Sequence, residues 1–102
     1  MSTSTIIIRK NGKKTDLNHT IRTRDLRKMI ELLNIPRSDD PNSACTHLIS
    51  CQDLKMRLEN MPIPAGMSDK DLQGHWLLDA ACEKSLREIG PNAVAHIYLD
   101  RN

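Results

Sequence analysis

The chain has 102 residues, a formal net charge of +2 and 38% hydrophobic residues, which is typical of a single soluble globular domain over residues 1–102. Aromatic residues make up only 2%, so aliphatic side chains and methionines must form the core. Apolar runs are no longer than that of Ile6 to Ile8, which excludes a membrane span of about 20 residues. Three cysteines are too few for a disulfide framework. The polar start predicts no secretory signal, and we therefore expect a cytoplasmic protein that does not associate with membranes.

Positive charge is concentrated in the first third of the chain. Residues 1–37 contain nine Lys/Arg and three Asp/Glu, a net charge of +6, whereas the remaining residues carry −4. Such asymmetry is typical of a nucleic-acid-binding face, of a surface for an acidic protein partner, or of head-to-tail self-association. It also arises when the two halves neutralise each other within one fold.

The start of the chain is predicted to be a β-hairpin. Residues 5–10 are rich in β-branched side chains, and residues 13–18 return as a second strand. Asn11-Gly12 between them is the strongest short-range signal for a two-residue type I′ turn. This turn predicts the cross-strand pairs Lys10–Lys13, Arg9–Lys14, Ile8–Thr15 and Ile6–Leu17, with Ile6, Ile8, Thr15 and Leu17 on the core face.

Three helices and two more strands are predicted after the hairpin. Thr23 is expected to N-cap the first helix, which ends near Leu33 and buries a stripe at i, i+3, i+4, i+7 spacing. A capping box at Ser50–Asp53 predicts the second helix, and the third is expected from Asp69 to Ile89 before Gly90-Pro91. The other predicted segments are an exposed loop over 36–43, a short strand over 45–49, a helix break over 62–66 and a closing strand over 93–100.

This order of elements indicates a small α+β domain. The hairpin and the closing strand are expected in one mixed sheet packed against two or three helices. The stretch Thr5 to Leu33 resembles the opening ββα unit of the ubiquitin-like β-grasp family, and Ala93-Val-Ala-His-Ile-Tyr-Leu-Asp100 resembles its closing strand, which lies between the first strand and its neighbours. The chain ends in Leu99-Asp-Arg-Asn102 without a di-glycine tail, so the resemblance does not imply a conjugatable modifier.

Residues with metal-ligand chemistry cluster once, at Cys45-x-His47-x3-Cys51. A closed zinc site needs four ligands, and the CxxC spacing of zinc modules is absent, so we expect neither a metal nor another cofactor. Cys82 lies on the apolar stripe of the third predicted helix, which favours a core residue over a nucleophile. Phosphate-binding glycine loops and hydrolase motifs are also absent. We therefore expect no catalytic residues and a protein that is not an enzyme.

The basic residues are the stronger functional signal. Strand two leads directly into the first helix, so the cations of the hairpin and of the helix are predicted to form one patch suited to phosphates. Its members are Arg9, Lys10, Lys13, Lys14, Arg24, Arg27 and Lys28. Aromatic residues that would stack on bases are absent from this set.

Trp76 is the remaining candidate for a binding residue. It lies off the main apolar stripe of its helix, with Leu72 and Ala80 at i−4 and i+4. Either it is buried beneath residues 62–66, or it is a partly exposed anchor for a partner or a second copy of the chain, since Trp is enriched at binding hot spots. The leading hypothesis is thus a small adaptor or inhibitor that binds an unidentified protein partner through charged surfaces. The alternative is a nucleic-acid-binding protein that uses the basic patch.

Overall fold

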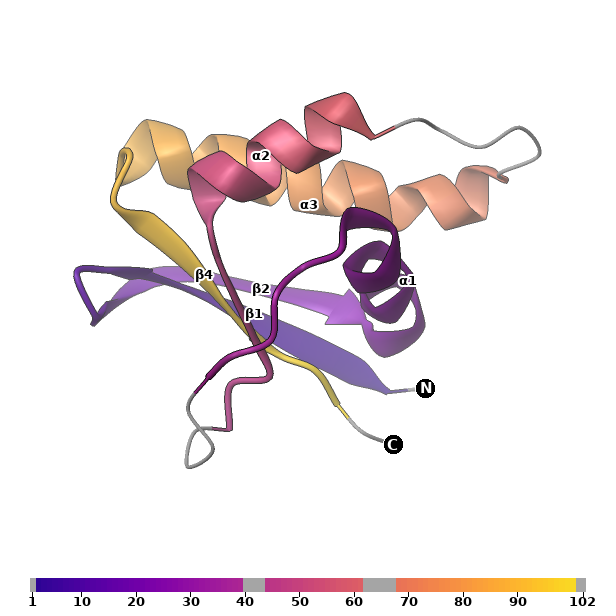
Figure 1. Ribbon diagram of the computed structural model, residues 1–102, viewed down its shortest axis with the longest axis horizontal. Helices are drawn as coiled ribbons and strands as arrows, with labels where there is room; N and C mark the ends of the chain where they lie inside the picture. The colour runs from indigo at the N-terminus through magenta and orange to yellow at the C-terminus, as the bar shows by residue number, and fades with distance from the viewer. Residues whose placement is uncertain (1, 40–43, 62–67, 101–102) are drawn as a thin grey trace.

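The structure, a computed structural model, describes residues 2–39, 44–61 and 68–100. These residues form a four-stranded sheet that carries three helices on one face (Figure 1). The α+β class predicted from the sequence is thereby confirmed. Within the described ranges, none of the helices is long and apolar enough to cross a membrane. In chain order the elements are β1 (Thr3–Lys10), β2 (Lys13–Arg22), α1 (Thr23–Leu33), β3 (His47–Ser50), α2 (Cys51–Asn60), α3 (Asp69–Glu88) and β4 (Ala93–Tyr98).

The strands lie in the order β2-β1-β4-β3, and each neighbouring pair is antiparallel. The expectation of a mixed sheet was therefore wrong. Helices α2 and α3 run in opposite directions, and α3 returns the chain to the end of the sheet that holds the hairpin turn (Figure 1). Because β4 starts there, with Ala93 opposite Lys10, it must run against β1. The resemblance to the ubiquitin-like β-grasp stays a prediction.

The N-terminal hairpin has the predicted turn. Asn11 and Gly12 both have positive φ, +51° and +80°, as a type I′ turn requires. Next to the turn, Lys10 pairs with Lys13 and Arg9 with Lys14, as expected.

A register shift follows between Ile7 and Arg9, so the predicted pair Ile6–Leu17 was wrong and Ile6 faces His19. The hydroxyl of Thr15 stabilises this irregularity: it donates to the Ile8 carbonyl (2.6 Å) and accepts from the Leu17 amide (3.2 Å). The shift is two residues, and the predicted core face of the hairpin is therefore preserved.

Helix α1 begins at Thr23, one residue earlier than a Thr23 N-cap would require, so the predicted N-cap was wrong. Arg22 is the N-cap, and no side-chain capping bond to it is present in the described residues. The Thr23 hydroxyl instead bonds the buried Ser4 hydroxyl (2.8 Å), which ties the helix to β1. Asn34 ends the helix in the left-handed conformation, with φ +52°.

The core lies between the sheet and the helices. Its members come from every element, and most of the apolar positions predicted for the first two helices are among them; Ile30 and Met61 pack against the core but are only partly buried. Ser50 caps α2 as predicted by accepting from the Asp53 amide (3.1 Å), and Gly90, at φ +98°, follows α3. The helix break predicted over 62–66 and the second half of the loop predicted over 36–43 lie outside the described residues. The fully or nearly buried apolar residues are Ile6, Ile8, Ile21, Leu26, Met29, Leu33, Ile35, Ile49, Cys51, Leu54, Leu58, Leu78, Cys82, Ala93, Ala95 and Ile97.

Candidate functional site

The cations predicted to form one patch lie in two separate groups. Arg9, Lys10, Lys13 and Lys14 surround the hairpin turn, whereas Arg24, Arg27 and Lys28 belong to α1 at the other end of β2. Ten residues of extended strand separate the groups by about 30 Å. Figure 1 shows the turn and α1 at opposite ends of the molecule. The prediction of a single patch was wrong because a long straight strand keeps its two ends apart.

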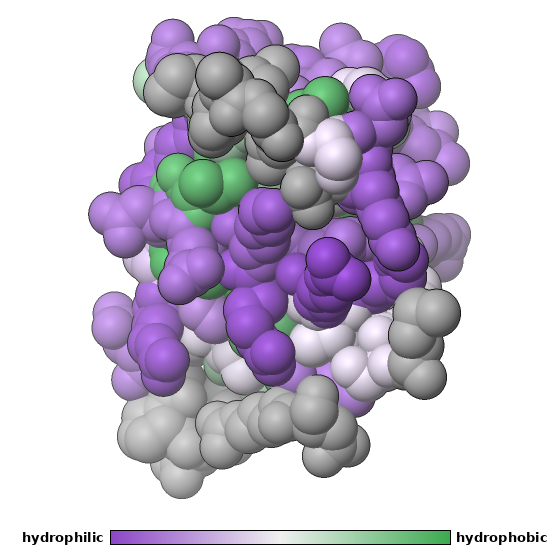
Figure 2. Space-filling model, turned by 90° about the vertical axis from the view of Figure 1, so that its right-hand side faces the viewer, coloured by the Kyte–Doolittle hydropathy of each residue, from purple (hydrophilic) through white to green (hydrophobic). Residues whose placement is uncertain are grey.

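The surface around α1 is strongly polar. Arg24, Arg27 and Lys28 are exposed, as their positions off the apolar stripe predict. Figure 2 views the molecule from the end that carries α1, and the coloured residues there are mainly hydrophilic, with small hydrophobic areas between them. This end of the molecule therefore offers charge to a partner but little apolar surface.

The metal-ligand candidates do not converge. Cys51 starts α2 inside the core, whereas the Cys45 thiol donates to the His47 carbonyl (3.1 Å) and lies 3.9 Å from His96 Nδ1. The His47 ring bonds the Thr46 hydroxyl through Nδ1 (2.9 Å). Within the part of the chain that the structure describes, no group of three or more His, Cys, Asp or Glu is arranged to hold a metal ion.

Two of the three thiols are enclosed in the core. Burial raises the pKa of Cys51 to about 11 and the pKa of Cys82 to about 12. Both side chains are therefore protonated at neutral pH and pack as small apolar groups, as the position of Cys82 on the apolar stripe predicted.

Trp76 is exposed to solvent over 55% of its surface. Of the two readings of this residue, the exposed one matches the structure. The next residue, Leu77, is 49% exposed, so two consecutive large apolar residues of α3 are exposed. Isolated exposed apolar residues are ordinary, but adjacent ones next to a concave surface are typical of an interface.

A groove of about 200 Å³ lies beside Leu77, between α3 and β2. Alternation along β2 directs His19 and Ile21 toward the helices, and the i, i+4 spacing of Leu77 and Ala81 places both on the side of α3 that faces β2. The groove is lined by Ile6, Asn18, His19, Thr20, Ile21, Leu77, Leu78 and Ala81.

His19, which lines the groove, has a buried polar atom without a partner among the residues that the structure describes. His19 Nε2 is shielded from water and has no hydrogen-bond partner in the described residues. Burial, and secondly the positive charge of Lys84, lower the pKa of His19. The imidazole is therefore neutral at pH 7, so the part of the groove wall that it forms carries no charge.

The two edges of the sheet differ. At the β3 edge, the chain before the strand adds backbone hydrogen bonds: the Leu48 amide donates to the Pro36 carbonyl (3.2 Å) and the Ser38 amide to the Thr46 carbonyl (3.0 Å). At the other edge, β2 pairs only with β1 among the described residues. The groove therefore runs along the unpaired edge of a ten-residue strand.

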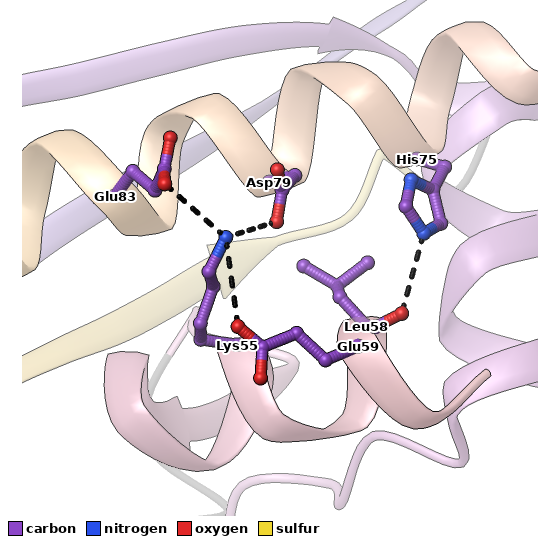
Figure 3. Close-up of polar contacts among 6 residues, drawn as sticks. All are labelled: Lys55, Leu58, Glu59, His75, Asp79 and Glu83. Carbon is purple, nitrogen blue, oxygen red and sulfur yellow. Dashed lines mark hydrogen bonds and ion pairs between the residues drawn. The ribbon is translucent and has the colours of Figure 1, made fainter.

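Two acidic residues of α3, Asp79 and Glu83, lie on the side of the helix that faces α2. Lys55 of α2 bonds Asp79 (2.6 Å) and is also close to Glu83 (3.6 Å) and Glu59 (4.0 Å), as Figure 3 shows. The hydrogen bond to Asp79 is the main cause that raises the pKa of Lys55. His75 Nε2 lies 3.4 Å from the Leu58 carbonyl in the same interface. The charge that acts on the pKa of His19 is that of Lys84.

Comparisons of the chain with protein-family models, with curated protein sequences and with solved structures found no match.

Sequence reasoning identified Trp76 but missed Leu77, His19 and Ala81 as parts of one surface. These residues come from β2 and α3. The sequence predicts both elements, but it does not indicate which helix will lie beside the second strand. Lys84 was not among the predicted cations, because it lies in the half of the chain with a net negative charge.

Proposed function

We propose that this protein is a non-enzymatic interaction module that binds a protein partner through the surface formed by β2 and α3. The observation that carries the proposal is the exposed Leu77 at the edge of the groove, preceded on α3 by the exposed Trp76. Large apolar side chains that border a concave surface are the usual centre of a protein interface, and Trp is the residue most enriched there.

Cations lie at the border of this surface, in keeping with the expectation that a partner binds through charged groups. Lys84 is exposed near His19, and Arg22, at the end of β2, bonds both Asp25 (2.9 Å) and Gln73 of α3 (3.4 Å). Charge at the rim of an interface steers the approach of a partner of opposite sign, and the apolar centre supplies most of the affinity. The combination favours an acidic protein partner.

The proposal is tested by partner capture with matched variants. The immobilised parent protein is exposed to a lysate of the cells that produce it, alongside Trp76→Ala/Leu77→Glu and the control Met56→Glu. Met56 is a suitable control because it is 56% exposed but belongs to α2. We expect the parent and the control to retain the same protein, and the α3 variant to lose it while its circular dichroism is unchanged. Equal retention by all three, or none by the parent, would contradict the proposal.

Nucleic-acid binding is a second candidate, and a specific feature of the hairpin supports it. The pairs Lys10–Lys13 and Arg9–Lys14 place like charges directly opposite each other around one turn. This arrangement costs a few tenths of a kcal/mol per pair, and a phosphate would relieve it. If it holds, Lys10→Ala/Lys13→Ala/Lys14→Ala should reduce the slope of log K against log salt for duplex DNA by about 3, and absence of binding by the parent at low salt would exclude it.

A further inference from the structure

We propose that the groove between β2 and α3 binds an extended acidic peptide, which adds to the sheet as a fifth strand along the free edge of β2. This inference rests on the proposed function and specifies the partner: a segment in extended conformation, with an apolar side chain in the groove and carboxylates on either side of it.

The backbone of β2 supports strand addition. Alternate residues of an edge strand direct their amide and carbonyl groups away from the sheet, so an incoming extended chain finds a row of donors and acceptors. The opposite edge, β3, already has partners from residues 36–38. Of the two edges, β2 is therefore the one open to a peptide.

The two halves of β2 differ in a way that locates the binding segment. The half near the turn carries Lys13, Lys14 and Asp16 and includes the register shift, and both charges and bulges discourage edge-to-edge pairing. The half beyond the shift, residues 18–21, has no carboxylate or ammonium group. The same four residues line the groove.

The side chains that line the groove could contact a peptide strand added between β2 and α3. A peptide paired with residues 18–21 directs alternate side chains toward α3, where Leu77 and Ala81 offer apolar contact. Lys84 attracts a carboxylate to the same place, since Asp79 and Glu83 face Lys55 on the far side of the helix (Figure 3).

A second copy of this chain fits the edge less well than an acidic peptide. If two β2 strands paired antiparallel about their midpoint, Lys13 of one copy would face Arg22 of the other at both ends of the ten-residue ladder. Like charges directly opposite each other destabilise a strand pair. The edge therefore selects against its own copy and favours a strand of opposite charge.

The test uses a synthetic heptapeptide titrated into the 15N-labelled protein; on the side that faces α3 it carries leucine flanked by glutamates, and the alternate positions are threonine. We expect amide shifts concentrated at residues 18–21 and around Leu77. A peptide of the same sequence with alternate amides N-methylated should not bind, because it lacks the strand hydrogen bonds. A version with lysine in place of glutamate should bind at least fivefold more weakly at low salt, and high salt should reduce the difference.

Charge-reversal variants of α3 provide the matched comparison. Lys84→Glu should weaken binding of the acidic peptide about fivefold, whereas Arg87→Glu, on the solvent side of the same helix, should leave it unchanged. Shifts elsewhere on the protein, equal binding of the acidic and basic peptides, or a β2-paired dimer of the parent in sedimentation would overturn the inference. If the protein still captures its partner through Trp76 and Leu77 after such a result, the proposed function stands and only the strand mode fails.

Discussion

Gly74 offers a direct test of how α3 packs against α1, because two effects of opposite sign compete there. Replacing Gly with Ala inside a helix ordinarily stabilises it by about 0.5–1 kcal/mol, since alanine loses less backbone entropy on folding. At Gly74, however, the added Cβ would lie 3.1 Å from Met29 Cγ, 3.3 Å from Asp25 Cβ and 3.3 Å from the Asp25 carbonyl oxygen. Ordinary contacts for such an atom begin near 3.4 Å.

The neighbours of Gly74 have little freedom to move. Met29 is fully buried, and both Asp25 atoms are held by the backbone of α1. Overpacking of this kind costs about 1–3 kcal/mol, which exceeds the gain in helix propensity. We therefore expect Gly74→Ala to lower the free energy of unfolding by about 1 kcal/mol.

Urea denaturation followed by far-UV circular dichroism measures this change. The control is Ala80→Gly, at an exposed position of the same helix, where only propensity acts and a loss of about 0.5–1 kcal/mol is expected. A Gly74→Ala protein more stable than the parent would refute the reasoning, because it would mean that α1 and α3 are not in close contact at this point.

Two further predictions concern the turn and the histidines. Gly12→Val should lower the free energy of unfolding by about 1–2 kcal/mol in the same urea assay, because φ is +80° at this position and a β-branched residue resists positive φ. The added Cβ would meet nothing within 4 Å, so the loss would come from the backbone conformation alone. An unchanged midpoint would contradict the turn. Burial is the main cause that lowers the pKa of His47 and His96 in the folded protein, so the unfolded chain takes up protons first as the pH falls below about 6.5. The urea midpoint should therefore be highest above this pH and fall between pH 7 and 5.5, and His96→Gln should reduce the fall; a midpoint that rises on acidification would contradict the assigned shifts.

Local features of this protein followed from the sequence because neighbouring residues alone decide them. Asn11-Gly12 tolerates positive φ, which produces the turn and the first two cross-strand pairs. Ser50 lies three residues before Asp53, close enough to cap α2 without help from the rest of the chain. The apolar spacing of Leu26, Met29 and Leu33 likewise predicted which side of α1 is buried.

The tertiary structure decided the features that depend on distant segments. The register beyond Ile7 follows from the Thr15 hydroxyl, which bonds two backbone groups that no pattern in the sequence connects. The direction of β4 depends on where α3 returns the chain, and this made the sheet wholly antiparallel. The groove also depends on distant segments. Leu77 of α3 and His19 of β2 are more than 50 residues apart in the sequence, and the fold brings both to the same groove. Hydrophobic periodicity specifies which side of a helix is buried, but the element it packs against is chosen by the fit of the whole core.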